Sequence, residues 1–508
     1  MADEIRNILI VGGGTAGWLT ASIIAAYHKD EAGNGPHVAL VEASDIPTVG
    51  VGEGTWPTMK NTVKEIGLKE HEFFRECYTA FKQGGKFVDW VHGNGDAYYH
   101  PFTVPLGYGK LDLAPYVDDI ADFASASNYQ QDVCEAGLAP RTLAESEFSG
   151  PCNYAYHVDA GALADLLKRH CVNNLGVEHI VDTVQDAVLN DDGSVRSLLL
   201  EQRGERAADL FVDCTGFASV LLGKKLGVPF KQADEFLFND SALAVHVPYA
   251  SADSPIACHT VATAQNAGWI WDIGLTHRRG VGHVYSSEYL SDAEAEGNLR
   301  RYIGPAGKDL DVRKIGFQSG HRETFWKHNV VGVGMSAGFV EPLEATAIML
   351  VEISARYIAE KLPPTRSTMA ITAKRFNQQM DYRWRRIIDF LKLHYTLTER
   401  PEPYWRAHAD TATVPESLQE DLAVWGARGP VAGDFESAIE LFPAASYQYV
   451  AYGMGFRPEF GQHSHLHRQA TQAQRIIERN NQLTQQMLHS LPPHREYIER
   501  WLASTAAA

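Results

Sequence analysis

A glycine-rich turn near the start of the chain restricts the fold more than any other feature of the sequence. Residues 6–11 form an apolar, β-branched run of the kind found in buried parallel strands, and G-x-G-x-x-G follows directly at Gly12, Gly14 and Gly17. Residues 18–26 are then predicted to be helical. Glycines at these positions let the backbone approach a pyrophosphate at the N-terminus of the helix. The pattern therefore predicts a βαβ unit that binds a dinucleotide.

The next strand supports this prediction. Residues 37–41 are apolar and β-branched, and the run ends at Glu42, where such folds hydrogen-bond the ribose hydroxyls of adenosine. Thr15 and Ala16 lie inside the turn and are expected to contact the same ligand. A lone G-x-G-x-x-G is a weak signal. Strand, turn, helix, strand and terminal acid occur here in order, which favours a dinucleotide site over a purely structural turn.

Two later segments indicate FAD rather than a nicotinamide cofactor. Residues 209–217 form an apolar strand ending in a polar, glycine-bearing turn, as in flavoproteins of the hydroxylase type. Residues 329–338 run from a strand into glycines, which is typical of a second dinucleotide site. However, residues 345–361 continue as helix, and no strand with a terminal acid follows. We interpret this segment as the helix N-terminus that faces the flavin ring, so reducing equivalents are expected from another protein.

The composition excludes several classes of function. Of the 508 residues, 45 are Lys or Arg and 63 are Asp or Glu, and the net charge of −18 argues against a nucleic-acid groove. The six cysteines are scattered without a Cys-x-x-Cys pair, which indicates reduced thiols. No apolar stretch approaches the roughly 20 residues that span a bilayer, and the acidic N-terminus is unlike a secretory signal. We therefore expect a cytoplasmic protein that binds neither nucleic acid nor membrane.

Four further segments resemble the flavin-dependent tryptophan halogenase family. The first, residues 49–57, resembles the family segment G-V-G-E-A-T-x-P, which contacts the flavin. The resemblance implies cofactor contacts at Gly52, Glu53 and Gly54, where Gly54 replaces the usual alanine.

The second segment, residues 81–90, resembles the part of the family that carries an essential lysine, and Lys82 occupies the aligned position. By themselves, Lys82 and Lys86 would be interpreted as solvated surface lysines. The resemblance implies instead that Lys82 is catalytic and leaves Lys86 as the alternative. Paired glycines and aromatic residues favour a strand or loop here over a helix.

The third segment contains Trp269 and Trp271 and matches the family signature W-x-W-x-I-P except at Gly274, which replaces proline. Tryptophans at a spacing of two point to one face of a strand. One interpretation is core packing, since tryptophan buries a large area anywhere. The interpretation that the resemblance implies is a wall between flavin and substrate, which disfavours direct oxygen transfer to the substrate.

The fourth segment, residues 338–348, resembles the family's E-P-L-E-S-T-G-I. The resemblance implies that Glu344 lies near the substrate and that the backbone amides of Thr346 and Ala347 bind halide. Amide donors near a helix start suit an anion. Ala345 and Ala347 replace the family's Ser and Gly, and because the halide contacts are made by backbone, these changes need not abolish binding.

The ordered set of matches runs from residue 6 to about residue 406 and implies the fold class. We expect an α/β, Rossmann-like FAD-binding fold of the flavoprotein monooxygenase and halogenase type, with a largely helical C-terminal part covering the substrate. The further cofactor contacts are assigned to Met335 and Ile348. The predicted FAD-binding module comprises about 1–100, 150–235 and 310–362, and the substrate-covering part about 101–149, 236–309 and 363–508. The protein is expected to be a monomer or a homodimer.

The resemblance also implies a reaction. Reduced FAD from a separate flavin reductase, dioxygen, and chloride or bromide make hypohalous acid, which moves past Trp269 and Trp271 to Lys82. There the acid is held by hydrogen bonding or converted to a haloamine, and Glu344 polarises the reagent or deprotonates the ring intermediate. The main alternative is a flavin-dependent aromatic monooxygenase, whose G-D-A-x-H element is replaced here by residues 334–338. A non-catalytic flavin-binding protein would need neither Lys82 nor Glu344.

The aromatic-rich residues 441–456 are expected to lie over the substrate. Family members that act on free tryptophan carry paired tyrosines with a downstream glutamate here, and no Glu lies between Leu441 and Arg457. We therefore expect indole, a substituted indole or a phenol as substrate in preference to tryptophan. His463, His465 and His467 are interpreted as a solvated turn, so no metal is expected. Three residues are candidates for lining the cavity or forming a packed loop: His100, Pro101 and Phe102.

Overall fold

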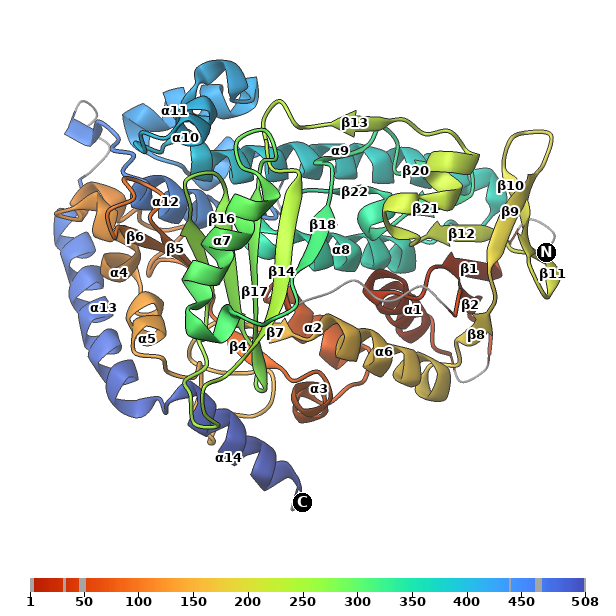
Figure 1. Ribbon diagram of the computed structural model, residues 1–508, viewed down its shortest axis with the longest axis horizontal. Coiled ribbons are helices and arrows are strands. Elements are labelled where there is room, and N and C mark those ends of the chain that lie inside the picture. Colours follow the sequence, from red (N-terminus) through yellow and green to blue (C-terminus); the bar gives the residue numbers. More distant parts are fainter. Residues whose placement is uncertain (1–3, 31–32, 45–51, 438–439, 462–467, 507–508) are drawn as a thin grey trace. The chain divides into compact units, whose positions relative to one another are not determined.

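The computed structural model describes residues 4–30, 33–44, 52–437, 440–461 and 468–506 (Figure 1). The chain divides into two compact units, and each is assembled from three stretches of sequence. Unit 1 comprises residues 1–79, 158–233 and 318–385, and unit 2 comprises residues 80–157, 234–317 and 386–508. Unit 1 contains most of the predicted FAD-binding module, whereas four stretches of that module belong to unit 2: residues 80–100, 150–157, 234–235 and 310–317.

Unit 1 is built on a six-stranded sheet in the order β20-β21-β12-β1-β2-β8. All neighbouring pairs are parallel except β20 with β21. The predicted strands at residues 6–11, 37–41 and 209–213 are confirmed as three adjacent central strands. The strands are β1 (Asn7–Val11), β2 (His37–Glu42), β8 (Glu178–Val181), β12 (Leu210–Asp213), β20 (Trp326–Lys327) and β21 (Val330–Gly332).

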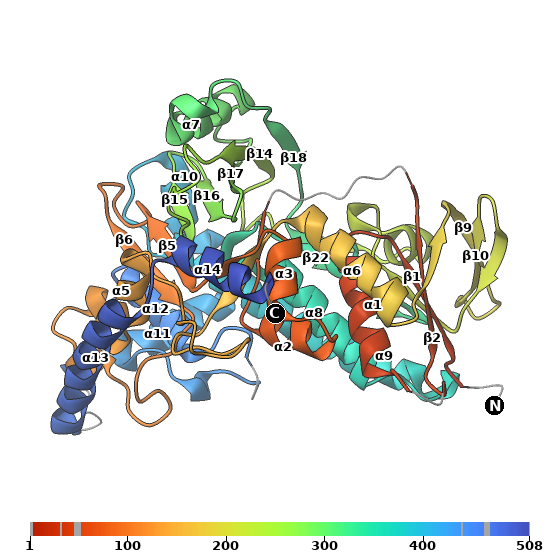
Figure 2. The same cartoon turned by 90° about the horizontal axis from the view of Figure 1, so that it is seen from below.

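Three helices form the layer that positions the predicted cofactor turn. The helix α1 (Thr15–Tyr27) packs against α6 (Ala160–Asn174) and α8 (Thr346–Glu360), as Figures 1 and 2 show. The sequence of α1 is apolar on all sides, and residues 17–25 are buried. The remaining elements of unit 1 are α2 (Thr58–Glu65), α3 (Glu70–Glu76), β3 (Glu53–Gly54), the hairpin strands β9 (Val184–Leu189), β10 (Val195–Leu200) and β11 (Gly204–Ala207), and the small sheet of β13 (Phe230–Gln232), β19 (Gly320–Arg322) and β22 (Gly338–Phe339).

Backbone contacts explain why two glycines of the turn are required. Gly12 has φ +110°, and a Cβ there would lie 2.4 Å from the carbonyl oxygen of Cys214, which follows β12. A Cβ at Gly17 would lie 1.8 Å from the carbonyl oxygen of Gly12. Nothing lies within 4 Å of the corresponding position at Gly14. The turn is therefore folded tightly against β12 and α1, and Gly14 is left beside open space.

Unit 2 is built on a seven-stranded sheet in the order β18-β14-β17-β16-β15-β5-β6. Only β15 and β5 are parallel. A separate short strand, β4 (Ala80–Lys82), pairs antiparallel with β7 (Ala155–Val158). The sheet strands are β5 (Gly84–Val88), β6 (Ala97–Pro101), β14 (Ser241–Pro248), β15 (Thr260–Ala264), β16 (Trp269–Gly274), β17 (Arg278–Tyr285) and β18 (Arg313–Gly316).

The C-terminal part of the chain is helical, as predicted. The polar tail forms α13 (Ala470–Ser490), and Pro492 and Pro493 separate it from α14 (His494–Ala506). None of the helices in the described ranges is both long and apolar enough to cross a membrane. The other helices are α4 (Phe123–Ser127), α5 (Gln130–Glu135), α7 (Asp292–Ile303), α9 (Arg366–Thr396), which contributes to both units, α10 (Pro403–Ala409), α11 (Glu416–Arg428) and α12 (Ala444–Gly453).

The two glycines Gly17 and Gly14 should respond differently to alanine. Gly17→Ala forces backbone apart within the turn, so we expect the melting temperature of the FAD-free protein to fall by roughly 3 °C, about 3 kcal/mol. Gly14→Ala places its methyl group in open space and should change that temperature by less than about 2 °C, while weakening FAD binding at least about 10-fold. Thermal melting and FAD titration measure the two effects. Equal loss of thermal stability in both variants would contradict this description of the turn.

Candidate active site

The Glu42 carboxylate lies over the glycine turn, at the predicted position. Lys168 donates from Nζ to Glu42 Oε1 over 2.6 Å, and His179 Nε2 lies 2.8 Å from the same oxygen. A Cβ at Gly13 would lie 1.5 Å from Glu42 Oε2 and 2.6 Å from Glu42 Cβ, so a glycine is needed at this position as well. Among the described residues, no side chain caps the N-terminus of α1. Uncapped amides, open space at Gly14 and a fixed carboxylate fit a dinucleotide.

The second predicted cofactor segment is described only in part, because residues 49–51 lie outside the described ranges. Gly52 has φ +132°, and Glu53 and Gly54 form the short strand β3. Burial raises the pKa of Glu53 to about 7. The Glu53 carboxyl is therefore largely protonated below neutral pH, unlike an ordinary glutamate.

The segment that contains Met335 differs from the prediction in one respect. The strand expected at residue 329 is β21, but no long helix follows the glycines. A single 3-10 turn, η6 (Gly334–Ser336), comes next, and a Cβ at Gly334 would lie 2.9 Å from the Cβ of Ala16. The structure thus brings the turn bearing Met335 against the start of α1. The predicted helix begins later, at Thr346, within one residue of the expected start at residue 345.

Two consecutive left-handed residues precede α8. Glu344 has φ +65° and Ala345 has φ +54°, although neither is glycine, and each such residue costs about 1–2 kcal/mol. The Trp56 indole donates from Nε1 to the Glu344 carbonyl over 2.7 Å and holds this peptide in place. The amides that follow lie at the positive end of the helix dipole, and within the described part of the chain no side chain caps them. Such a concave run of N–H groups fits an anion.

The start of α8 places the four predicted residues in different surroundings. Thr346 and Ile348 are buried, Glu344 is half-buried and Ala347 is exposed. One and a half turns further along, the buried Glu352 accepts hydrogen bonds from Thr62 over 2.5 Å and from Thr58 over 3.2 Å. These bonds fix α8 to α2, and burial raises the pKa of Glu352 to about 7.

Lys82 is buried, with 4% of its surface exposed, at the end of β4. Its Nζ lies 5.3 Å from the centroid of the Phe102 ring. Lys86 instead forms an ion pair with Glu135 over 2.8 Å. The interpretation of both lysines as solvated surface groups is therefore wrong for Lys82. The catalytic role of Lys82 stays a prediction.

His157 is a neighbour of Lys82 that was not predicted as a site residue. It lies on β7 directly opposite Ala80, so its side chain shares a sheet face with Lys82, two residues further along β4. Burial, and then the positive charge of Lys82, hold the pKa of His157 well below its ordinary value. Its Nε2 lies 2.8 Å from Thr260 Oγ1. Lys82 thus lies beside a neutral imidazole. This pairing of two strands cannot be found from a single sequence.

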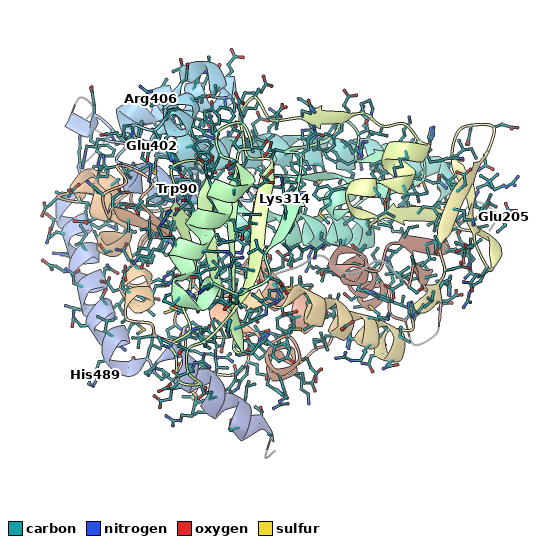
Figure 3. The ribbon with its side chains drawn as sticks, in the orientation of Figure 1. Trp90, Glu205, Lys314, Glu402, Arg406 and His489 are labelled. Atoms are coloured by element: carbon teal, nitrogen blue, oxygen red, sulfur yellow. The ribbon has the colours of Figure 1, made fainter. Side chains whose placement is uncertain are left out.

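The two predicted tryptophans lie on β16, as the spacing predicted. Trp269 is 1% exposed and packs against Trp90, labelled in Figure 3, with ring centroids 6.2 Å apart. The Trp271 ring covers Gly282 of the adjacent strand, where a Cβ would be 2.1 Å from the ring. Trp269 thus has the contacts of a core residue. The role of the pair as a wall stays a prediction.

The remaining predicted residues lie on β6 and just after it. His100 is buried and its Nε2 lies 2.8 Å from Ser446 Oγ of α12, and Pro101 is buried beside it. Phe102, half-buried, lies under the Lys82 amine. The aromatic-rich segment forms the buried helix α12, from which Tyr449 donates to the Thr103 carbonyl over 2.9 Å. The histidines at 463, 465 and 467 lie outside the described residues.

The strain at Ala345 generates a direct prediction. Glycine adopts φ +54° without the Cβ clash, so Ala345→Gly should raise the free energy of unfolding by about 1 kcal/mol. The matched variant Ala347→Gly lies in the first turn of α8 and should lower it by up to about 1 kcal/mol. Thermal melting of the two variants under identical conditions measures the difference. A loss of stability in Ala345→Gly would show that the left-handed conformation is not strained.

Comparison with known proteins identifies the family. Residues 7–472 match the tryptophan halogenase family. The chain is similar to a 7-chloro-L-tryptophan 6-halogenase, KtzR of Kutzneria sp. strain 744, with 34% identity over 97% of this chain and 99% of the relative.

Solved structures agree over nearly the whole chain. A tryptophan halogenase from Shewanella frigidimarina NCIMB 400 shares 42% identity with a TM-score of 0.94, covering 98% of both chains. BrvH, a flavin-dependent halogenase from Brevundimonas sp. BAL3, shares 31% identity with a TM-score of 0.85, covering 98% of this chain and 99% of BrvH. The predicted fold class is confirmed by these matches. The chain belongs to the tryptophan halogenase family and is a flavin-dependent halogenase.

Proposed function

We propose that the protein halogenates indole or a related electron-rich aromatic ring, using Lys82 to deliver the halogen. The observation that carries this proposal is the burial of Lys82 at the position of the family's essential lysine. A surface lysine would be solvated, and its amine would bind or activate hypohalous acid no better than an amine free in solution. A buried amine next to an aromatic ring holds a reagent in a fixed position, excluded from water.

The cofactor of this reaction is FAD, received in reduced form from a separate flavin reductase. The turn at Gly12, Gly14 and Gly17 would hold its pyrophosphate, with Glu42 on the adenosine ribose. Reduced flavin, when bound, supplies the two electrons with which dioxygen and halide give hypohalous acid. Glu42 is held for this purpose by Lys168 and His179, which keep the carboxylate over the turn.

The halide would be held by backbone at the start of α8. The left-handed Glu344 and Ala345 turn the chain so that the amides of Thr346 and Ala347 come at the positive end of the helix. Because these donors are backbone groups, Ala345 and Ala347 in place of the family's Ser and Gly preserve the contacts. Chloride and bromide are both anions that backbone amides can bind in this way.

Lys82 would bind hypohalous acid by donating a hydrogen bond from Nζ or react with it to give a haloamine. Forming a haloamine requires that the ammonium lose a proton. The neutral His157, on the same sheet face of the adjacent strand, adds no second positive charge there. Glu344 would polarise the reagent or accept the proton that leaves the ring after the halogen has added.

The nature of the substrate is the finer part of the proposal. The named relatives are tryptophan 6- and 7-halogenases, and these names do not support a non-tryptophan substrate. The support comes from residues 441–457, which contain no glutamate to pair with the amino group of tryptophan. The tyrosines of α12 are buried, and the Tyr449 hydroxyl donates a hydrogen bond to the Thr103 carbonyl.

Lys82→Met keeps the length of the side chain and removes the amine. We expect halogenated product to fall by about 10²–10⁴-fold, the range for loss of a general acid or base, while halide-dependent flavin oxidation continues. Lys86→Met removes only a partly exposed ion pair worth about 0–1 kcal/mol and should keep activity within about fivefold. Product is measured by mass spectrometry with reductase, FAD, NADH and bromide. Undiminished product in Lys82→Met would rule out the assigned role.

A substrate panel separates the two classes of ring. With indole and L-tryptophan at equal concentration, we expect kcat/KM for indole to exceed that for tryptophan by at least about tenfold, since no clamp offsets the desolvation of the charged amino acid. The isotope pattern of the product identifies the halogen. Preference for tryptophan would overturn the substrate proposal and leave halogenation intact, whereas hydroxylated product without halide would indicate a monooxygenase.

A further inference from the structure

Two cysteines and a histidine form a buried cluster in unit 2. Cys134 lies on α5, and Cys258 and His259 directly precede β15. The two Sγ atoms and one ring nitrogen of His259 all lie within 4.8 Å of one another. The Sγ of Cys258 is 3.9 Å from His259 Nδ1 and 3.8 Å from the Cys134 carbonyl oxygen. These side chains belong to segments 124 residues apart, so the fold itself brings the thiols together.

The cluster is bonded to the strands that carry Lys82. Gln83, the residue after Lys82, donates from its backbone amide to the Cys258 carbonyl over 2.7 Å. Two residues after Cys258, Thr260 contacts His157, the neighbour of Lys82 on β7. A small neutral reagent that reaches Lys82 therefore arrives in the same part of unit 2 as the two thiols.

The surroundings favour a reactive thiol at Cys258. The hydrogen bond with Cys134 and the contact with His259 hold the pKa of Cys258 below its usual range, and the same pairing raises the pKa of Cys134. A thiolate is the nucleophilic form of cysteine. The other titratable groups that face the cluster are Lys86 and Glu135, joined as an ion pair, Tyr99, whose ring packs edge-on against His259, Cys152 and His494.

The same three groups resemble a metal site, but the described residues provide no fourth ligand. Structural zinc sites take four protein donors, and three-donor sites keep an open position for water, whereas all three side chains here are buried. The nearest carboxylate, Glu135, is paired with Lys86 over 2.8 Å. His494 accepts from the Phe81 amide at Nε2 and contacts the Ile256 carbonyl at Nδ1, so both of its nitrogens are used. The arrangement therefore fits a redox-active thiol pair better than a zinc centre.

We propose that Cys134 and Cys258 reduce hypohalous acid that is not consumed at Lys82, and that they close a disulfide in doing so. The Cys258 thiolate attacks the halogen and releases hydroxide, giving a sulfenyl halide. The Cys134 thiol then attacks that sulfur, which expels halide and loses a proton. Overall, two thiols and one hypohalous acid give one disulfide, water, halide and a proton, with both electrons supplied by sulfur.

This step protects the site from its own reagent. Hypohalous acid made without a ring to halogenate would otherwise attack neighbouring side chains such as Trp271 and Phe102. A thiol reductant that reaches the buried pair reverses the disulfide, so the pair can act repeatedly. The inference rests on the proposed function, because that reaction is the source of the oxidant.

The first experiment runs the enzyme without an aromatic substrate. The protein is incubated with reductase, FAD, NADH, bromide and catalase, which removes hydrogen peroxide, and is then alkylated and digested for peptide mapping. We expect a Cys134–Cys258 disulfide approaching one per chain, at least tenfold less of it when bromide is omitted or indole is present, and none after thiol reductant. Cys152→Ser, which removes another buried cysteine facing the cluster, should form the same disulfide.

A second experiment separates this inference from the proposed function. One equivalent of hypobromous acid is added directly to the wild-type protein and to Cys134→Ser and Cys258→Ser. We expect the disulfide only in the wild type, and more oxidation of methionine and tryptophan in both variants. If direct addition gives the disulfide but turnover does not, the enzyme makes no hypohalous acid and the proposed function fails. If direct addition leaves both thiols intact, the proposed reduction by Cys134 and Cys258 is wrong. It is also wrong if each wild-type chain retains one zinc ion that Cys258→Ser lacks.

Discussion

The hydrogen bond from the Trp56 indole to the Glu344 carbonyl fixes the part of the chain on which the chemistry depends. It joins residues 288 positions apart and holds a peptide next to two left-handed residues that together cost about 2–4 kcal/mol. A chain free to relax would extend α8 backwards through Glu344 and cover its own amides. The bond, with the hydrogen bonds from Thr58 and Thr62 of α2 to Glu352, fixes the start of α8 where the amides of Thr346 and Ala347 lie.

The parts assigned to oxidant production and to halogen transfer come from different units of the chain. The glycine turn, Glu42 and the start of α8 belong to unit 1, whereas Lys82 and both tryptophans belong to unit 2. This division suits a reagent that is made at one place and used at another. It also requires control of the reagent on the way, and the thiol pair at Cys134 and Cys258 would provide that control where the lysine lies.

The sequence predicted the local elements well and the long-range contacts poorly. The central strands, the glycine turn and the strand of Trp269 follow from periodicity and from contacts a few residues apart. A helix N-terminus was expected directly after the glycines at residues 332–338, where a single 3-10 turn lies instead, and nothing marks Glu344 and Ala345 as left-handed when neither is glycine. Burial of Lys82 could be inferred only from the family resemblance. The contact between Trp56 and Glu344 and the cysteine cluster depend on tertiary packing, which no local pattern encodes.

The most direct measurement is the location of bromide by anomalous diffraction from crystals of the FAD complex soaked in bromide. Ala345→Pro, which cannot adopt the left-handed conformation, provides a matched control. We expect one strong peak within about 3.5 Å of the amide nitrogens of Thr346 and Ala347 in the wild type, and its loss in the variant. Strong bromide peaks elsewhere with none at these amides would contradict a halide site at the start of α8.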